Sequence, residues 1–138
     1  MREVLEPRAV LLNESAATRD EAIVRCGEVL VEIGAVAPPY VQAMIERERS
    51  ISTYVGEQVA IPHGVSKEHV LRDALCVLRF PAGIDWDGER VTLCVGIAAR
   101  GDGHVALLAE LAEVLLDPER ARTLREATDV DTVLKELT

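Results

Sequence analysis

The sequence predicts an α/β fold, a single domain built on a β-sheet with helices on both faces. Three observations predict it. Short apolar runs alternate with segments in which apolar residues recur at helical spacing. The nearly continuous apolar run at residues 91–99 is typical of a central strand covered on both faces. With 138 residues, the chain is long enough for one domain with its own core, and residues 1–138 are interpreted as that domain.

The first expected helix is marked at both ends. A short apolar run at residues 9–12 precedes it and is expected to be a strand. Thr18 and Glu21 then have the spacing of a capping box, with Thr18 as the N-cap and Glu21 reaching back. Apolar residues follow at helical spacing, and Gly34 suits the C′ position. The helix is therefore expected between Thr18 and Gly34.

A second helix is expected to open at Pro38 and Pro39, because proline is tolerated in the first turn of a helix. Arg47 and Arg49 lie in its charged last turn, where a positive charge offsets the negative end of the helix dipole. The expected buried stripe of this helix consists of Val41, Met44 and Ile45.

The rest of the chain continues the alternation of strands and helices. The strand that begins at Ala74 is expected to stop at Pro81, and Asp102 is the expected N-cap of the helix that carries His104. The expected strands are residues 52–55, 59–61, 74–80 and 91–99; a single helical turn is expected at 67–71, a turn at 85–88, and further helices from His104, Asp117 and Thr128 onward.

Charge and cysteine content limit the possible partners and the compartment. The formal net charge of −9 argues against nucleic acid and anionic membranes as partners and suits a basic protein. The three cysteines, Cys26, Cys76 and Cys94, lie in apolar patterns and form no CxxC, which indicates buried thiols in a reducing cytoplasm. Neither a signal pattern nor an apolar run of membrane-spanning length is present in the sequence.

Two histidines are expected at the ends of strands. The apolar run at residues 59–61 leads to His63, which is framed by Pro62 and Gly64. Proline lacks the amide that would continue the strand, and glycine leaves room for a partner to approach the imidazole. His104 opens the helix that follows another strand. Since sites in open α/β sheets form beyond the carboxyl ends of strands, we expect both imidazoles in one crevice.

This arrangement favours phosphoryl transfer. A neutral His63 can attack phosphorus through one ring nitrogen while its other nitrogen is held by an acceptor. The N-terminus of the following helix favours an anion and the neutral form of His104, which can still donate one hydrogen bond to a phosphoryl oxygen. Arg47 or Arg49 is expected to balance the phosphoryl charge. Such positioning and charge stabilisation are most of what phosphoryl transfer requires.

Several stretches together resemble the enzyme IIA domains of the bacterial sugar phosphotransferase system, mannitol/fructose type. They are Ile-Glu-Arg-Glu-Arg at 45–49, Thr-Tyr-Val-Gly-Glu-Gln-Val-Ala-Ile-Pro-His-Gly at 53–64, Phe-Pro-Ala-Gly-Ile-Asp-Trp at 80–86 and Val-Gly-Ile-Ala-Ala-Arg-Gly-Asp-Gly-His at 95–104. Residues 17–22 and 40–44 look like the mannitol branch. The resemblance covers nearly the whole chain and implies a mixed, mostly parallel sheet flanked by helices on both faces.

The resemblance also implies roles for single residues. His63 matches the histidine that accepts a phosphoryl group from the phosphocarrier HPr and passes it to a cysteine of a mannitol-type enzyme IIB. His104 matches a second active-site histidine that is not phosphorylated, Arg47 a nearby arginine and Glu57 a nearby carboxylate. Arg100, like Arg49, is a weaker candidate for the role of Arg47. We expect no cofactor and no bound metal.

The organisation of the chain implies transfer between separate proteins. With no IIB domain and no membrane-spanning IIC part in the sequence, we expect the phosphoryl group to pass in trans to a permease of the mannitol type. His104 favours the sugar-transport branch over the nitrogen-regulatory relatives, in which this position is not expected to be histidine. The sugar or polyol itself is not readable from the sequence.

The sequence leaves two other functions open. In the first, phosphorylation of His63 only controls affinity for a regulated protein partner. In the second, His63 and His104 hold a metal with a cysteine, although neither HxxxH nor CxxC supports this.

Overall fold

The computed structural model describes residues 2–65, 67–100 and 103–137, and its described side chains leave out residue 2 and residues 103–105. The described strands form one five-stranded sheet in the order β1-β4-β5-β3-β2. The strands are β1 Val10–Leu11, β2 Tyr54–Gly56, β3 Val59–Ala60, β4 Ala74–Trp86 and β5 Glu89–Ala98. The helices are α1 Arg19–Glu32, α2 Tyr40–Ser50, α3 Gly103–Leu115, α4 Pro118–Arg125 and α5 Val130–Glu136, and short 3-10 turns lie at Arg2–Val4, Pro7–Ala9 and Lys67–His69.

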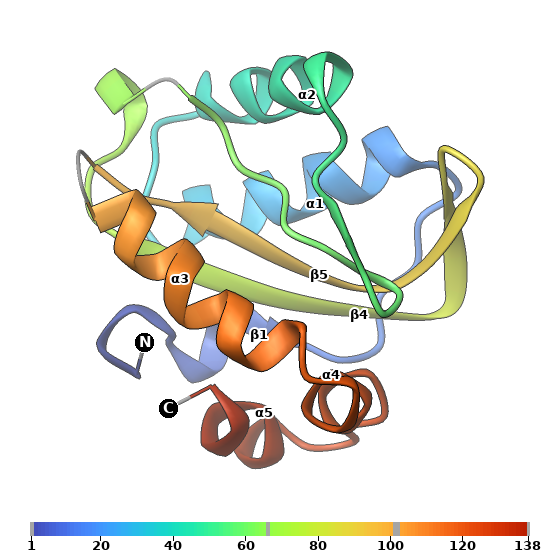
Figure 1. Ribbon diagram of the computed structural model, residues 1–138. Coiled ribbons are helices and arrows are strands. Elements are labelled where there is room, and N and C mark those ends of the chain that lie inside the picture. Colours follow the sequence, from blue (N-terminus) through green and yellow to red (C-terminus); the bar gives the residue numbers. More distant parts are fainter. Residues whose placement is uncertain (1, 66, 101–102, 138) are drawn as a thin grey trace.

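The sheet is mixed. β1 pairs with β4 and β3 with β5 in parallel, whereas β4 pairs with β5 and β2 with β3 antiparallel. An isolated bridge between His63 and Ile97 extends the parallel pairing of β3 with β5. Helices α1 and α2 lie on one side of the sheet, and α3, α4 and α5 lie on the other (Figure 1). The predicted mixed sheet with helices on both faces is confirmed.

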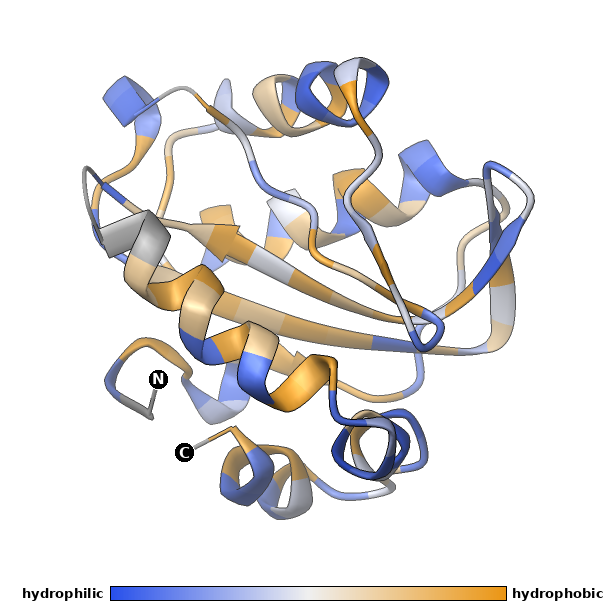
Figure 2. Cartoon of the chain, viewed as in Figure 1, coloured by the Kyte–Doolittle hydropathy of each residue, from blue (hydrophilic) through white to orange (hydrophobic). Residues whose placement is uncertain are grey.

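The core lies between the sheet and these helices. The paired parts of β4 and β5 are almost wholly hydrophobic, and polar residues gather on the outer sides of the helices and at the loops (Figure 2). Every residue from 91 to 99 is buried, and β5 lies between β4 and β3. This confirms the prediction of a central strand from its continuous apolar sequence.

The predicted boundaries of α1 are confirmed. The Thr18 hydroxyl accepts a hydrogen bond from the amide of Glu21 at 3.2 Å, and the Glu21 carboxylate accepts one from the amide of Ala17 at 2.8 Å. At the other end Gly34 has a φ of +76°, which L side chains rarely adopt. The amide of Ala35 returns to the carbonyl of Leu30, at 2.9 Å, which closes the C-terminal cap.

Helix α2 begins at Tyr40, directly after the two prolines that were expected in its first turn, and Pro39 is its N-cap. Its buried side also differs from the prediction. Met44 and Ile45 are buried, and Val41 is only half-buried. Two residues outside the predicted stripe, Tyr40 and Glu48, are also buried.

Strand β4 is longer than predicted. The strand was expected to stop at Pro81, yet it continues through that residue to Trp86. The missing amide of proline is tolerated because the pairing register with β5 shifts between Arg79 and Ile84, so no regular ladder bond is lost there. The Arg90 guanidinium donates to the carbonyls of Ala82 and Pro81, at 3.2 and 3.5 Å, and bridges the irregular stretch.

The remaining predicted helices are present. Asp117 caps α4 by accepting from the amides of Glu119 and Arg120, and Asp129 caps α5 by accepting from the amide of Thr132. The predicted turn at 67–71 is a 3-10 turn at Lys67–His69. The predicted N-cap of α3, Asp102, lies outside the described residues.

We expect Gly96→Ala to destabilise the sheet, because a Cβ at this position would lie 2.5 Å from Sγ of Cys76 and 3.2 Å from Cβ of Cys26. All three cysteines are buried, as predicted. Overpacking of this kind costs about 1 to 3 kcal/mol in the free energy of unfolding. Urea unfolding should show that Cys76→Ala in the same chain recovers part of this loss. The double variant should then lose less free energy of unfolding than the two single variants lose together. If the two losses simply added up, a clash between the new Cβ and Sγ of Cys76 would not be the cause of the destabilisation.

Candidate active site

His63 lies just beyond β3, at the edge of the sheet where the parallel strands β3 and β5 both end. It is bridged to Ile97 of β5, whose amide donates to the carbonyl of Pro62 at 2.9 Å. The residue is 6% exposed, so most of the imidazole is enclosed by protein. A side chain enclosed to this extent has few orientations.

The orientation of the His63 ring fixes which nitrogen is nucleophilic. Nδ1 lies 2.8 Å from the carbonyl oxygen of Ile61. A carbonyl only accepts hydrogen bonds, so Nδ1 carries the proton in the neutral ring and Nε2 carries the lone pair. The geometry therefore prepares Nε2 to attack an electrophile, as expected for a histidine held through its other nitrogen.

Tyr40, the first residue of α2, reaches the same place. Its hydroxyl accepts a hydrogen bond from the amide of Gly64 at 2.9 Å and lies 2.9 Å from the carbonyl of Ile97, to which it donates. Burial raises the pKa of the Tyr40 phenol, and the hydrogen bond from Gly64 offsets only part of that effect. The hydroxyl therefore stays protonated and able to donate at neutral pH.

Gly64 makes room for α2 and not for a partner of the imidazole. Its missing Cβ was expected to give a partner access to the imidazole. A Cβ at Gly64 would instead lie 3.0 Å from Cε1 of Tyr40 and 3.2 Å from Cβ of Ala43. The space that glycine leaves is thus filled by α2, and glycine is required there for packing.

The start of α3 follows β5, as His63 follows β3. Because these strands are parallel, their carboxyl ends meet at one edge of the sheet. The backbone of His104 belongs to the first turn of α3, as predicted. Its side chain lies outside the described residues, so the expected meeting of the two imidazoles stays a prediction.

The three candidate arginines make different contacts. Nη1 of Arg47 donates to the carbonyl of Ile51 at 2.5 Å, at the end of α2. Arg49 forms an ion pair with Asp20 of α1, with 3.4 Å between Nη2 and Oδ2. Arg100 is exposed, and its amide donates to Asp73 at 2.8 Å. Arg47 is therefore the candidate tied to the loop that leads into β2.

Glu57 lies at the opposite end of β3 from His63. It occupies the turn between β2 and β3 with a φ of +53°, where its carbonyl accepts from Arg125 at 2.8 Å and its carboxylate lies 3.6 Å from the same guanidinium. The sheet register pairs Val59 with Leu93 but His63 with Ile97, a shift of roughly 13 Å along the strand direction. The structure does not bring Glu57 and His63 together.

A buried carboxylate near the end of α2 was missed by the sequence analysis. Glu48 is 2% exposed and accepts hydrogen bonds from the amide and the hydroxyl of Thr53, at 2.7 and 2.5 Å, and from the indole nitrogen of Trp86 at 3.1 Å. It joins α2 to the segment before β2 and to the end of β4. The charged run at residues 46–49 concealed it, because such a run is usually a solvated face.

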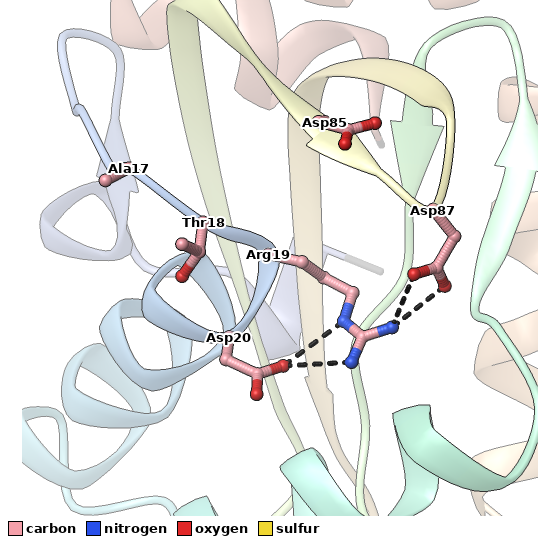
Figure 3. A pocket seen from close by; sticks show the side chains of 6 residues that line it. All are labelled: Ala17, Thr18, Arg19, Asp20, Asp85 and Asp87. Carbon is pink, nitrogen blue, oxygen red and sulfur yellow. Dashed lines mark hydrogen bonds and ion pairs between the residues drawn. The ribbon is translucent and has the colours of Figure 1, made fainter.

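A surface pocket of about 400 Å³ lies away from His63, between the start of α1 and the turn of the β4–β5 hairpin (Figure 3). Its centre is the Arg19 guanidinium, which lies 2.8 Å from Asp87 and 3.2 Å from Asp20. Burial lowers the pKa of Arg19, but the hydrogen bond to Asp20 and the charges of both carboxylates outweigh it, so that the pKa is raised. The pocket is thus a salt-bridged junction between α1 and the hairpin.

The described residues hold neither a metal-binding cluster nor a membrane-spanning helix. Among the described residues, no group of three histidine, cysteine or acidic side chains is arranged to hold a metal ion. Within the same part of the chain, each helix is too short or too polar to cross a lipid bilayer.

Comparison with known proteins gives a consistent match. Residues 3–138 match the family model described as "Phosphoenolpyruvate-dependent sugar phosphotransferase system, EIIA 2". A mannitol-specific phosphotransferase enzyme IIA component of Staphylococcus aureus (strain N315) is 36% identical over 135 residues, which cover 96% of this chain and 94% of the relative. A mannitol-specific EIICBA component of Pasteurella multocida (strain Pm70) is 39% identical over 95% of this chain, which spans 22% of that longer protein.

Solved structures agree with these sequence relatives. The crystal structure of IIA mannitol from Escherichia coli matches with a TM-score of 0.88 and 38% identity, over 96% of this chain and 98% of that chain. The complex of enzyme IIA and phosphorylated enzyme IIB of the mannitol system of Escherichia coli contains a chain that matches with a TM-score of 0.89 and 37% identity, over 97% of this chain and 98% of that chain.

Proposed function

Because this chain belongs to the EIIA 2 family of the phosphoenolpyruvate-dependent sugar phosphotransferase system, we propose that His63 accepts a phosphoryl group from phospho-HPr and passes it to a cysteine of a mannitol-type enzyme IIB. The observation that carries the proposal is the contact between Nδ1 of His63 and the carbonyl of Ile61. It leaves the Nε2 lone pair as the nucleophile. We place this work in the cytoplasm, within residues 1–138 acting as one IIA domain.

The transfer has two steps at the same nitrogen. In the first, Nε2 forms a bond to phosphorus as the bond between phosphorus and the donor breaks. In the second, the sulfur of the IIB cysteine forms a bond to phosphorus as the bond to Nε2 breaks. Throughout, the Ile61 carbonyl holds the proton on Nδ1, which keeps the ring oriented and stabilises the positive charge that develops on the ring during attack.

The remaining residues act on the phosphoryl charge. We assign His104 to hydrogen bonding with a phosphoryl oxygen, since the N-terminus of α3 follows the strand beside His63 and favours an anion. We assign Arg47 to charge balance by its guanidinium. Glu57 is given no role at the phosphorus, because its contacts are to Arg125 at the other end of β3.

The arginine assignment makes a prediction. Arg47→Gln should lower the rate of phosphorylation by phospho-HPr about tenfold, the usual scale for losing a charge-assisted contact of about 1.4 kcal/mol. Arg49→Gln should change that rate by less than about twofold, because its guanidinium pairs with Asp20 of α1. The rate is measured for both variants by quenching the labelling reaction at a series of times. If Arg49→Gln were slow and Arg47→Gln normal, the assignment would be reversed.

The experiment that tests the proposal is reconstitution of the relay. The protein is incubated with enzyme I, HPr and ³²P-labelled phosphoenolpyruvate, and then with a mannitol-type IIB. We expect one acid-labile phosphate per chain and movement of that label to IIB. Without labelling the proposal fails. Labelling that never moves to IIB would favour the regulatory function, in which phosphorylation of His63 only controls a protein partner.

A further inference from the structure

The backbone that carries His63 leaves β5 in an irregular way. In a regular parallel pair, hydrogen bonds run from one strand to the next on both sides of a bridged residue. On the N-terminal side of His63 this holds, since the amide of Ile97 donates to the carbonyl of Pro62 at 2.9 Å. On the C-terminal side a side chain intervenes. The Tyr40 hydroxyl accepts from the amide of Gly64 at 2.9 Å and contacts the carbonyl of Ile97 at 2.9 Å.

This hydroxyl is fixed from several directions. Tyr40 is 1% exposed, and its ring fills the space beside Gly64, so closely that a Cβ there would lie 3.0 Å from the ring. The hydroxyl is also 3.3 Å from the carbonyl of Gly64. Because the ring is held by the start of α2, the hydroxyl keeps one position relative to the strand. It therefore lies where the pairing with β5 ends, immediately after His63.

We propose that Tyr40 is a positioning residue for His63, whose hydroxyl links Gly64 to Ile97 and so keeps Nδ1 of His63 on the carbonyl of Ile61 and Nε2 turned toward the reactant. The inference rests on the proposed function for its consequence in phosphoryl transfer. Its structural part concerns the resting protein alone. Tyr40 does not touch the phosphoryl group in this account; it acts through the backbone on either side of His63.

Removing the Tyr40 hydroxyl should therefore change the position of the chain around His63. Without the hydroxyl, the Gly64 amide and the Ile97 carbonyl lose their shared partner, and the chain after His63 is free to shift. The Nδ1 contact depends on a short loop from Ile61 to His63, so the same shift weakens it. A misplacement of about 1 Å in a reacting group lowers a rate by up to about a hundredfold.

The test compares Tyr40→Phe with Tyr54→Phe. Tyr54 is the other tyrosine of the chain and is half-buried in β2, so both variants lose one hydroxyl. Long-range ¹H–¹⁵N NMR of the unphosphorylated protein reports which nitrogen of His63 carries the proton. We expect one tautomer, with the proton on Nδ1, in the wild type and in Tyr54→Phe, and a mixture of tautomers in Tyr40→Phe. The kcat for phosphorylation by phospho-HPr should fall about tenfold or more in Tyr40→Phe, with KM for phospho-HPr nearly unchanged.

The outcomes separate this inference from the proposed function. If the wild type takes up no phosphate, the proposed function fails, while the tautomer measurement still tests Tyr40. If Tyr40→Phe keeps the wild-type tautomer and rate, the positioning role is overturned. If Tyr40→Phe does not fold, Gly64→Ala is used in its place, because the added methyl group would press on the Tyr40 ring. A mixture of tautomers in that variant supports the role, and the wild-type tautomer there contradicts it.

Discussion

Replacing His63 with glutamine is expected to lower the rate of phosphoryl uptake from phospho-HPr by at least about a thousandfold, the scale on which removing a nucleophile acts. Glutamine has a polar side chain of similar reach, so the enclosed site keeps a hydrogen-bonding group near the carbonyl of Ile61. An amide has no nucleophilic nitrogen lone pair, and no bond to phosphorus forms. Labelling with ³²P-phosphoenolpyruvate, enzyme I and HPr measures the loss.

His69→Gln is the matched control for this experiment. His69 ends the 3-10 turn Lys67–His69, and its Nε2 lies 3.7 Å from the carboxylate of Glu68, at a partly exposed position. Its substitution should leave labelling within about twofold of the wild type. If labelling survived in His63→Gln and disappeared in His69→Gln, the phosphorylated residue would be His69 and the proposed function of His63 would be wrong.

Replacing Glu48 with alanine is expected to have the largest effect on stability. Its carboxylate is the acceptor for three donors: the amide and hydroxyl of Thr53 and the indole of Trp86. Each buried donor left without a partner costs about 1 to 3 kcal/mol. With each of the three donors in the lower half of this range, we expect a loss of about 3 to 5 kcal/mol in the free energy of unfolding. Thermal unfolding followed by circular dichroism should show a melting temperature lower by about 10 °C or more.

Glu46→Ala provides the comparison, because Glu46 is an exposed residue of the same helix and loses the same number of atoms. It should change stability by less than about 0.5 kcal/mol. Equal stability of the two variants would mean that the buried carboxylate contributes nothing, contrary to its three buried hydrogen bonds.

The helix boundaries were predictable because their causes are local. The capping box at Thr18 and Glu21 and the C′ glycine at Gly34 act within one turn of the helix that they end, and both are confirmed. The central strand β5 was predictable for a related reason, since burial on both faces leaves a continuous apolar sequence.

The errors arose where a distant partner decides the outcome. Pro81 normally ends a strand, but here the irregular pairing with β5 allows β4 to continue to Trp86. Glu48 looked like part of a solvated charged run until Thr53 and Trp86 folded against it. Nothing in the local sequence specifies these contacts, because they form only when β2 and β4 meet the end of α2.

The candidate site was predictable to a similar extent. His63 stands at the end of a strand as expected, framed by Pro62 and Gly64. The part played by Tyr40 was not visible, because a tyrosine after two prolines gives no sign that its hydroxyl reaches Gly64 and Ile97. The sequence likewise placed Glu57 six positions before His63 but could not show that the strand between them carries the two residues to opposite ends.

In the proposed function one nitrogen, Nε2 of His63, carries the phosphoryl group. The most direct measurement is a ³¹P–¹⁵N correlation spectrum of the phosphorylated protein labelled with ¹⁵N-histidine, which is simple because the chain has three histidines. We expect a single phosphorus coupled to Nε2 of His63, with Nδ1 still protonated. Phosphorus on Nδ1 of His63, or on His69 or His104, would overturn the assignment to Nε2 of His63.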